Sequence, residues 1–244
     1  MGLKWGWLPG FETERAVETA APVETTATTR VGRLLEQRLH HTQAEVCVEL
    51  LVNRAPKYGN DNEPADRFTR LAAEVYCQKV EKHTNPRGGR YQPGLYTVTT
   101  HVALGLAVGA TPDGRRAGAP LSQGVSPVQG RDRKGPTAAM KSAARLNHTL
   151  VSNGSAFNQK LNPAFLRGGK GPKTLASLLR GYFQLGGMQL QWDLIDNEML
   201  RAAQEHPENY RDLIVRVSGY SAFFTDLERV VQDDIIMRME HAVT

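Results

Sequence analysis

The chain has 244 residues, of which 40% are hydrophobic, so it can form one large domain or two small ones around a sizeable core. Its formal net charge of +5 arises from scattered basic residues, and no stripe of basic and aromatic residues predicts a nucleic-acid surface. No apolar run approaches the roughly 18 residues of a membrane span, and the start lacks a signal-peptide core, so we expect a cytoplasmic protein.

The sequence contains two cysteines, Cys47 and Cys77, and neither belongs to a C-x-x-C pair. We therefore expect neither a disulfide scaffold nor a bound metal. A phosphate cradle is also not predicted, because neither G-x-x-x-x-G-K-[ST] nor G-x-G-x-x-G occurs. We expect no bound cofactor.

Residues 1–42 differ in composition from the rest of the chain. Residues 17–30 are rich in Thr and Ala and contain few core-forming side chains, so we expect a poorly ordered segment. A short helix is predicted over Arg33–His41.

Two helices are predicted next, and each contains one of the cysteines. Val46, Leu50 and Leu51 share one helical face, and Pro64 is suited to the first turn of the following helix. Cys47 and Cys77 are expected to be small core residues of these helices. The second helix has an apolar stripe formed by Phe68, Leu71, Ala72, Val75 and Val80.

The middle of the chain combines turns with short regular elements. High β-propensity predicts a strand over Leu95–Thr99. Pro112–Gly114 is the centre of a turn-rich loop, and Pro136 lies near the start of a predicted helix. A glycine-rich linker is expected over Gly168–Gly171.

Strands and helices alternate after this linker, which favours an α/β fold. Lys173–Leu185 is predicted to be a helix ended by Gly186, and Met188–Leu194 alternates as a strand does. Another helix is predicted from Asn197, capped by Asp196, to Pro207. The final helix has an apolar row formed by Leu227, Val231, Ile235 and Met239.

The segment Arg216–Ala222 lies between the apolar run Asp212–Val215 and a predicted capping box over Thr225–Glu228. Gly219 is thus expected in a tight connection between a strand and a helix. By itself, Gly219 can be explained as a turn glycine with positive φ. However, this segment matches every fixed position of R-V-x-G-Y-x-A, and the region from Gly186 to the end closely resembles the C-terminus of the glycyl radical enzymes. That family includes pyruvate formate-lyase, several dehydratases and the arylsuccinate synthases.

The resemblance covers about residues 43–244 and implies the C-terminal portion of a ten-stranded α/β barrel, with the glycine loop in its interior. It divides the chain into an unmatched segment 1–42, a barrel piece 43–120 and a glycine radical domain 121–244. It also implies a lyase or dehydratase-type enzyme, and family members are often homodimers. "GATPDGR" within Gly109–Leu121 favours the dehydratase or arylsuccinate branch.

For the site, the resemblance implies that Gly219 carries a stored radical. An α-carbon radical is stabilised between an amide nitrogen donor and a carbonyl acceptor, and a Cβ would crowd the planar centre. A radical S-adenosylmethionine activase would install it in an anaerobic cytosol. The surrounding loop residues, which this activase would recognise, are Arg216, Val217, Ser218, Tyr220, Ser221 and Ala222.

The family's working oxidant, a cysteine thiyl in a G-C-x-E motif, has no convincing counterpart in the sequence. Val46–Glu49 is the nearest match, but it lacks the glycine and lies in a helical pattern. Three explanations stay open: a truncated gene product, which we favour, a stand-alone radical subunit that docks with a cysteine-bearing chain, or a non-catalytic scaffold. The sequence does not identify the substrate.

Overall fold

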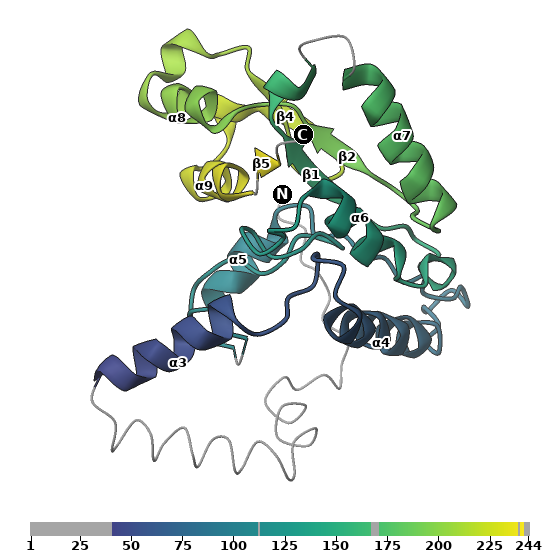
Figure 1. The fold of residues 1–244 in the computed structure, drawn as a ribbon. Helices are drawn as coiled ribbons and strands as arrows, with labels where there is room; N and C mark the ends of the chain where they lie inside the picture. The colour runs from purple at the N-terminus through teal and green to yellow at the C-terminus, as the bar shows by residue number, and fades with distance from the viewer. Residues whose placement is uncertain (1–40, 112, 167–170, 239, 242–244) are drawn as a thin grey trace. The chain divides into compact units, whose positions relative to one another are not determined.

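The computed structural model describes residues 41–111, 113–166, 171–238 and 240–241 (Figure 1). The Thr/Ala-rich stretch, nearly all of the helix predicted over Arg33–His41 and most of the glycine-rich linker lie outside these ranges. The chain divides into two compact units, residues 1–55 and 56–244, which are described separately. Within the described ranges, no helix has both the length and the apolar character needed to cross a membrane.

The first unit is represented by helix α3, His41–Asn53, which confirms the predicted helix around Val46 and Leu50. Cys47 is exposed on this helix rather than buried as we had expected. The side chain of Asn53 donates to Glu49 Oε2 at 2.6 Å, one helical turn away.

The second unit begins with α4, Glu63–Val80, where Pro64 lies in the first turn as predicted. Asn62 caps this helix by accepting a hydrogen bond from the Ala65 amide. The predicted stripe, however, does not face the core, since Phe68 is 72% exposed and Leu71 is 53% exposed. The buried residues of α4 are Asp66 and Cys77. The spacing therefore identified the helix but not its buried face.

Polar contacts to a second helix explain why that other face of α4 is buried. The carboxylate of Asp66 accepts hydrogen bonds from Ser142 and Arg145, at and just beyond the end of α6, Pro136–Ala144. Arg145 also pairs with Asp61 at 2.5 Å. The predicted helix near Pro136 is confirmed.

The strand predicted over Leu95–Thr99 is wrong. Leu95 forms an isolated parallel bridge with Ser155, and the chain then turns into α5, Thr100–Ala107. Val98 has φ 54°, which is incompatible with an extended strand. High β-propensity was outweighed by the turn in which the Thr100 amide bonds the Thr97 carbonyl.

A parallel β-α-β unit forms the centre of the fold. Strand β1, Asn158–Leu161, is followed by α7, Gly171–Gln184, and by β2, Gln191–Asp193, which pairs with β1 in parallel. Strand β5, Glu240–His241, pairs with the other edge of β1. Gly186 follows α7 with φ 97°, as its predicted role requires, whereas β2 is shorter than the predicted strand.

The side chains of Phe157 and Tyr182 meet in the core beneath α6 and α7, with ring centroids 5.6 Å apart. Figure 1 shows the three strands between α7 and the pair formed by α8 and α9. Aromatic contact and helix cover thus bury the sheet, as expected for a parallel arrangement.

The C-terminal part comprises α8, Asn197–Glu205, a hairpin and α9, Arg229–Met237. Asp196 caps α8 as predicted, accepting from the Met199 amide at 2.7 Å. The hairpin pairs β3, Ile214–Arg216, with β4, Ser221–Phe223. A second core joins these elements through Leu200, Ala203, Val215, Val217, Phe224 and Ile235. Within the ranges that the structure describes, 3-10 helices span His148–Leu150, Pro163–Leu166, Pro207–Asn209 and Phe224–Asp226.

The predicted capping box at Thr225–Glu228 is wrong. Phe224–Asp226 forms a 3-10 turn instead, and Glu228 precedes α9 without a side-chain capping bond. Because residues 221–223 pair with β3 and Phe224 is fully buried, the chain cannot enter a helix at Thr225. Gly219 therefore connects two strands rather than a strand and a helix.

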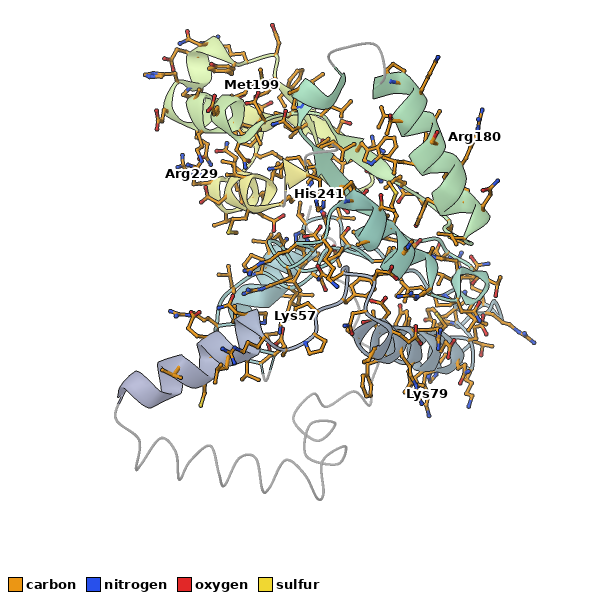
Figure 2. The ribbon with its side chains drawn as sticks, in the orientation of Figure 1. Lys57, Lys79, Arg180, Met199, Arg229 and His241 are labelled. Atoms are coloured by element: carbon orange, nitrogen blue, oxygen red, sulfur yellow. The ribbon has the colours of Figure 1, made fainter. Side chains whose placement is uncertain are left out.

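The second core, which includes Leu200, should contribute most of the stability of the elements that hold the hairpin. Leu200→Ala removes a side chain that is 0% exposed, and we expect it to lower the free energy of unfolding by about 2–5 kcal/mol. The neighbouring Met199, labelled in Figure 2, is 42% exposed, so Met199→Ala should change it by less than about 0.5 kcal/mol. Denaturant titration of both variants checks this, and equal effects would contradict the assignment of the core.

Candidate functional site: the glycine loop

Gly219 lies near the tip of the β3–β4 hairpin. The last strand pair is Arg216 with Ser221, and the Val217 amide donates to the Tyr220 carbonyl at 2.9 Å. Gly219 has φ 78°, and a Cβ built on it would meet no atom within 4 Å. The loop therefore favours glycine because of its backbone conformation and not because of crowding. Gly219 and Tyr220 are exposed.

The side chain of Arg216 folds back across the loop to which it belongs. Its Nε donates to Gln191 Oε1 at 2.7 Å and its Nη1 to Ser221 Oγ at 3.1 Å. Its Nη2 lies 3.5 Å from the Gly219 carbonyl oxygen. The same Gln191 oxygen accepts a hydrogen bond from the Gly219 amide at 3.3 Å. Both polar groups of Gly219 therefore have side-chain partners.

A buried arginine holds the loop from the inside. Arg238, which follows α9, donates to the Arg216 carbonyl at 3.0 Å and to the Val217 carbonyl at 2.8 Å. The Val217 carbonyl also accepts from Gln123 Nε2 at 2.8 Å. Arg238 is 8% exposed, so these bonds form away from water, where they are electrostatically stronger. Two consecutive carbonyls before Gly219 are thus fixed to a buried cation.

Two carboxylates orient Arg238. Asp193 Oδ2 lies 3.2 Å from its Nη1, and Asp234 Oδ2 lies 3.5 Å from its Nη2. The other oxygen of Asp193 accepts from the Arg216 amide at 2.8 Å. Burial raises the pKa of Asp193, outweighing the opposing effect of the Arg238 cation on that pKa. Because the effect of desolvating Asp193 exceeds that of its attraction to Arg238, we interpret the Asp193–Arg238 ion pair as one that orients the arginine rather than one that adds stability.

The network continues from Asp234 into the neighbouring elements. His101 Nε2 on α5 lies 3.1 Å from Asp234 Oδ2, and Gln129 Nε2 donates to Asp234 Oδ1 at 2.5 Å. Asp234 and His101 are each only 1% exposed. The position of the glycine loop is therefore coupled to α5 and α9 through one continuous set of buried polar contacts.

A hollow of about 430 Å³ opens beside Gly219. The buried Ser218 Oγ on its wall has no hydrogen-bond partner within the part of the chain that the structure describes. Val98, also on this wall, has the strained φ of 54° noted above, and such strain is frequent at functional sites. The lining residues are Tyr96, Val98, Asn153, Gly154, Ser155, Ala156, Gln189, Gln191, Ser218, Gly219 and Tyr220.

Cys77 is not a member of this site. Cys77 is 1% exposed in α4, and burial raises the pKa of its thiol, which keeps it protonated. Cys47 belongs to the other unit. The described ranges contain no group of three His, Cys, Asp or Glu side chains that could hold a metal ion.

The structure places the seven predicted loop residues on one hairpin, with Val217 and Ser218 buried and Ser221 exposed. Sequence reasoning missed the residues that hold the loop: Gln123, Gln191, Asp193, Asp234 and Arg238. Gln191 and Asp193 could have been found, because they alternate with apolar residues in a predicted strand. Arg238 could be suspected only from its i, i+4 spacing to Asp234.

Comparison with known proteins accounts for this arrangement. A family model described as glycine radical matches residues 121–225, and one described as pyruvate formate lyase-like matches residues 23–105. The chain is 43% identical over 198 residues to the probable dehydratase YbiW of Escherichia coli, covering 78% of this chain and 24% of that protein. The chain belongs to the glycyl radical enzyme family.

Two further matches show how much of these enzymes the chain represents. It is 39% identical over 189 residues to the 4-hydroxyphenylacetate decarboxylase glycyl radical subunit of Clostridioides difficile, covering 77% of this chain and 21% of that protein. The glycerol-bound B12-independent glycerol dehydratase of Clostridium butyricum superimposes with a TM-score of 0.82 at 48% identity. That match covers 88% of this chain and 27% of the dehydratase chain.

The chain thus spans about a quarter of the length of the relatives it matches. Its mixed α/β fold is the C-terminal portion of a glycyl radical enzyme barrel, as the sequence resemblance predicted. The pyruvate formate lyase-like match begins at residue 23, so the similarity extends upstream of residue 43, the limit predicted from the sequence.

The loop contacts predict a large effect of Arg238. Arg238→Met leaves Asp193 and Asp234 without their buried partner, so we expect a loss of about 3–5 kcal/mol in stability. We also expect faster hydrogen exchange at the Val217–Tyr220 amides, even under conditions where the rest of the chain stays protected.

Arg229→Met is the matched control for this variant. Arg229, labelled in Figure 2, has a side chain that is 64% exposed and an ion pair with Asp233 at 3.4 Å. Such pairs contribute little, so the control should change stability by less than about 0.5 kcal/mol. Hydrogen exchange with mass spectrometry checks both variants, and unchanged loop exchange in Arg238→Met would show that the buried cation does not hold the loop.

Proposed function

We propose that Gly219 stores an unpaired electron on its α-carbon and that the chain is the radical-bearing part of a lyase or dehydratase-type glycyl radical enzyme. The main support for this proposal is that Arg216–Ala222 matches the family signature. This segment lies on a hairpin whose backbone is held by the buried Arg238 cation. Although no other part of the described chain lies within 4 Å of a Cβ built on Gly219, a side chain would crowd a planar radical centre against the two peptide groups that flank it, and the positive φ already favours glycine there.

The stored radical serves a cysteine on another part of the enzyme. A hydrogen atom moves from the cysteine sulfur to the Gly219 α-carbon, so that an S–H bond breaks, a C–H bond forms and a thiyl radical remains. Cys77 cannot supply this hydrogen because it is buried in α4. The hollow beside Gly219, with the unpartnered Ser218 hydroxyl, is suited to receive the cysteine-bearing segment.

Installation of the radical requires an external enzyme, because the proposed chemistry needs an oxidant that removes a hydrogen atom from Gly219. We infer a radical S-adenosylmethionine activase acting in an anaerobic cytoplasm, with no cofactor bound by this chain. It would recognise Arg216, Val217, Ser218, Tyr220, Ser221 and Ala222. Because Val217 and Ser218 are buried, the hairpin would have to move away from the residues that cover it before the activase could contact the whole segment.

The partition of the chain follows the same proposal. Residues 43–120 would complete the wall of the barrel and residues 121–244 would form the glycine radical domain. Because the pyruvate formate lyase-like match begins at residue 23, residues 23–42 would also belong to the barrel piece, and only residues 1–22 would lie outside both. The exposed apolar face of α4, including Phe68, Leu71 and Val75, supports a barrel wall that other parts of the enzyme cover. Two copies of the complete enzyme would associate as a homodimer.

A stand-alone radical subunit is the second candidate. One relative is named a glycyl radical subunit, but this chain spans only 21% of that protein's length, so the name alone does not favour a small separate subunit. In that case the cysteine would reside on a separate chain that docks beside Gly219. A non-catalytic scaffold is the third candidate, and it predicts that no radical can be installed.

Anaerobic incubation of the full chain with a cognate activase, S-adenosylmethionine and reductant should give a doublet in the EPR spectrum. Gly219→Ala should abolish the doublet while the chain stays folded, because the strain of a non-glycine residue at φ 78° is only about 1–2 kcal/mol. Gly181→Ala is the matched control, since a Cβ at Gly181 on α7 also meets open space. A doublet that persists in Gly219→Ala would refute the assignment.

A further inference from the structure

We propose that Gln191 and Arg216 tune the stability of the radical by polarising the two amide groups that flank the Gly219 α-carbon. The inference rests on the proposed role of Gly219. It concerns positioning residues, because neither side chain takes part in the transfer of the hydrogen atom.

Gln191 places a hydrogen-bond acceptor beside the Gly219 amide, which is the group that would donate electron density to a radical on the α-carbon. An α-carbon radical on Gly219 would share spin with the glycine's own nitrogen, whose lone pair donates electron density. Gln191 Oε1 accepts the N–H of that nitrogen at 3.3 Å. A hydrogen bond that draws the proton away from nitrogen makes the nitrogen a better electron donor. Gln191 therefore strengthens the donor side.

Arg216 supplies the opposite polarisation on the acceptor side. The Gly219 carbonyl withdraws electron density from the α-carbon, and the guanidinium Nη2 lies 3.5 Å from its oxygen. A cation beside this oxygen makes the carbonyl a better acceptor. The guanidinium is held there by its shorter bonds to Gln191 at 2.7 Å and to Ser221 at 3.1 Å. Donor and acceptor effects act together on one α-carbon.

The orientation of the Gln191 amide follows from its neighbours. The guanidinium and the Gly219 N–H are both obligatory donors, so the atom of Gln191 between them must be the oxygen. The Gln191 backbone is fixed in β2, where it pairs with Asn158 of β1. The acceptor is therefore presented by a strand of the central sheet rather than by the loop itself.

Gln191→Leu tests the inference because Gln191 lies outside the R-V-x-G-Y-x-A segment that the activase would recognise. Loss of the acceptor reduces the spin shared with nitrogen and leaves more on the α-carbon, so the splitting of the EPR doublet by the remaining α-hydrogen should increase. Gln191→Glu keeps an oxygen acceptor and adds a negative charge, so its splitting should be equal to or smaller than the native one. Gln184→Leu, at the exposed end of α7, is the control and should leave the splitting unchanged.

A second measurement reads the hydrogen bond in the resting chain. With ¹⁵N-labelled glycine, the Gly219 amide can be identified by its absence in Gly219→Ala. Its proton resonance should move upfield in Gln191→Leu and stay in place in Gln184→Leu. An unchanged Gly219 resonance would overturn the inference even if a doublet forms.

The outcomes separate this inference from the proposed function. If the native chain gives a doublet and Gln191→Leu gives a doublet with the same splitting, the tuning role is overturned and Gly219 remains the radical site. Absence of a doublet in the native chain refutes the proposed function and the tuning role together. If Gln191→Leu does not fold, a larger splitting in Gln191→Glu than in the native chain overturns the inference instead.

Discussion

A buried guanidinium is the constraint on which the glycine loop depends. Arg238 binds two consecutive carbonyls on one side and two carboxylates on the other, in a region from which water is largely excluded. An isolated buried charge is costly, so the four partners are mutually required. As a result, the backbone before Gly219 has one favoured position, set jointly by β2, α5 and α9. If Gly219 stores a radical as we propose, the loop needs such fixation, because a small displacement would change the distance between Gly219 and the cysteine that the radical serves.

Release of the loop would break several contacts of this network. If the hairpin moved out of this position, the hydrogen bonds from Arg238 to the Arg216 and Val217 carbonyls would both break, and Asp193 would be exposed to water. Burial raises the pKa of Asp193, so opening would return this carboxylate to the water that favours its charged form and would offset part of the cost of opening. We infer that the polar contacts give the closed loop a defined geometry without making it permanently closed.

The helices with strong end signals could be predicted from the sequence. Asp196 and Gly186 lie at the helix boundaries where their chemistry places them, and Pro64 and Pro136 lie in the first turns of their helices. The errors have physical causes. Leu95–Thr99 has strand-forming residues, but a local turn competes with the single bridge it can make. Helical spacing on α4 reveals an apolar face without revealing what covers it.

The candidate site could be predicted only in part. Gly219 is a candidate from the sequence because a linear motif surrounds it, whereas Arg238, Asp234 and Gln123 come from segments far apart in the sequence. Their roles depend on side chains that meet in three dimensions, and buried polar residues have no periodic pattern of their own. The hairpin was also missed, since short strands such as Ser221–Phe223 are defined by pairing rather than by propensity.

Exposure of the activated chain to air tests the central claim most directly. Dioxygen adds to an α-carbon radical, and the peroxyl product breaks the main chain at that residue. Mass spectrometry should find a large fragment ending at Ser218 and a small one beginning at Tyr220, with loss of the EPR doublet over the same period. Intact protein after the doublet has disappeared, or a cut at any other residue, would contradict the assignment of the radical to Gly219.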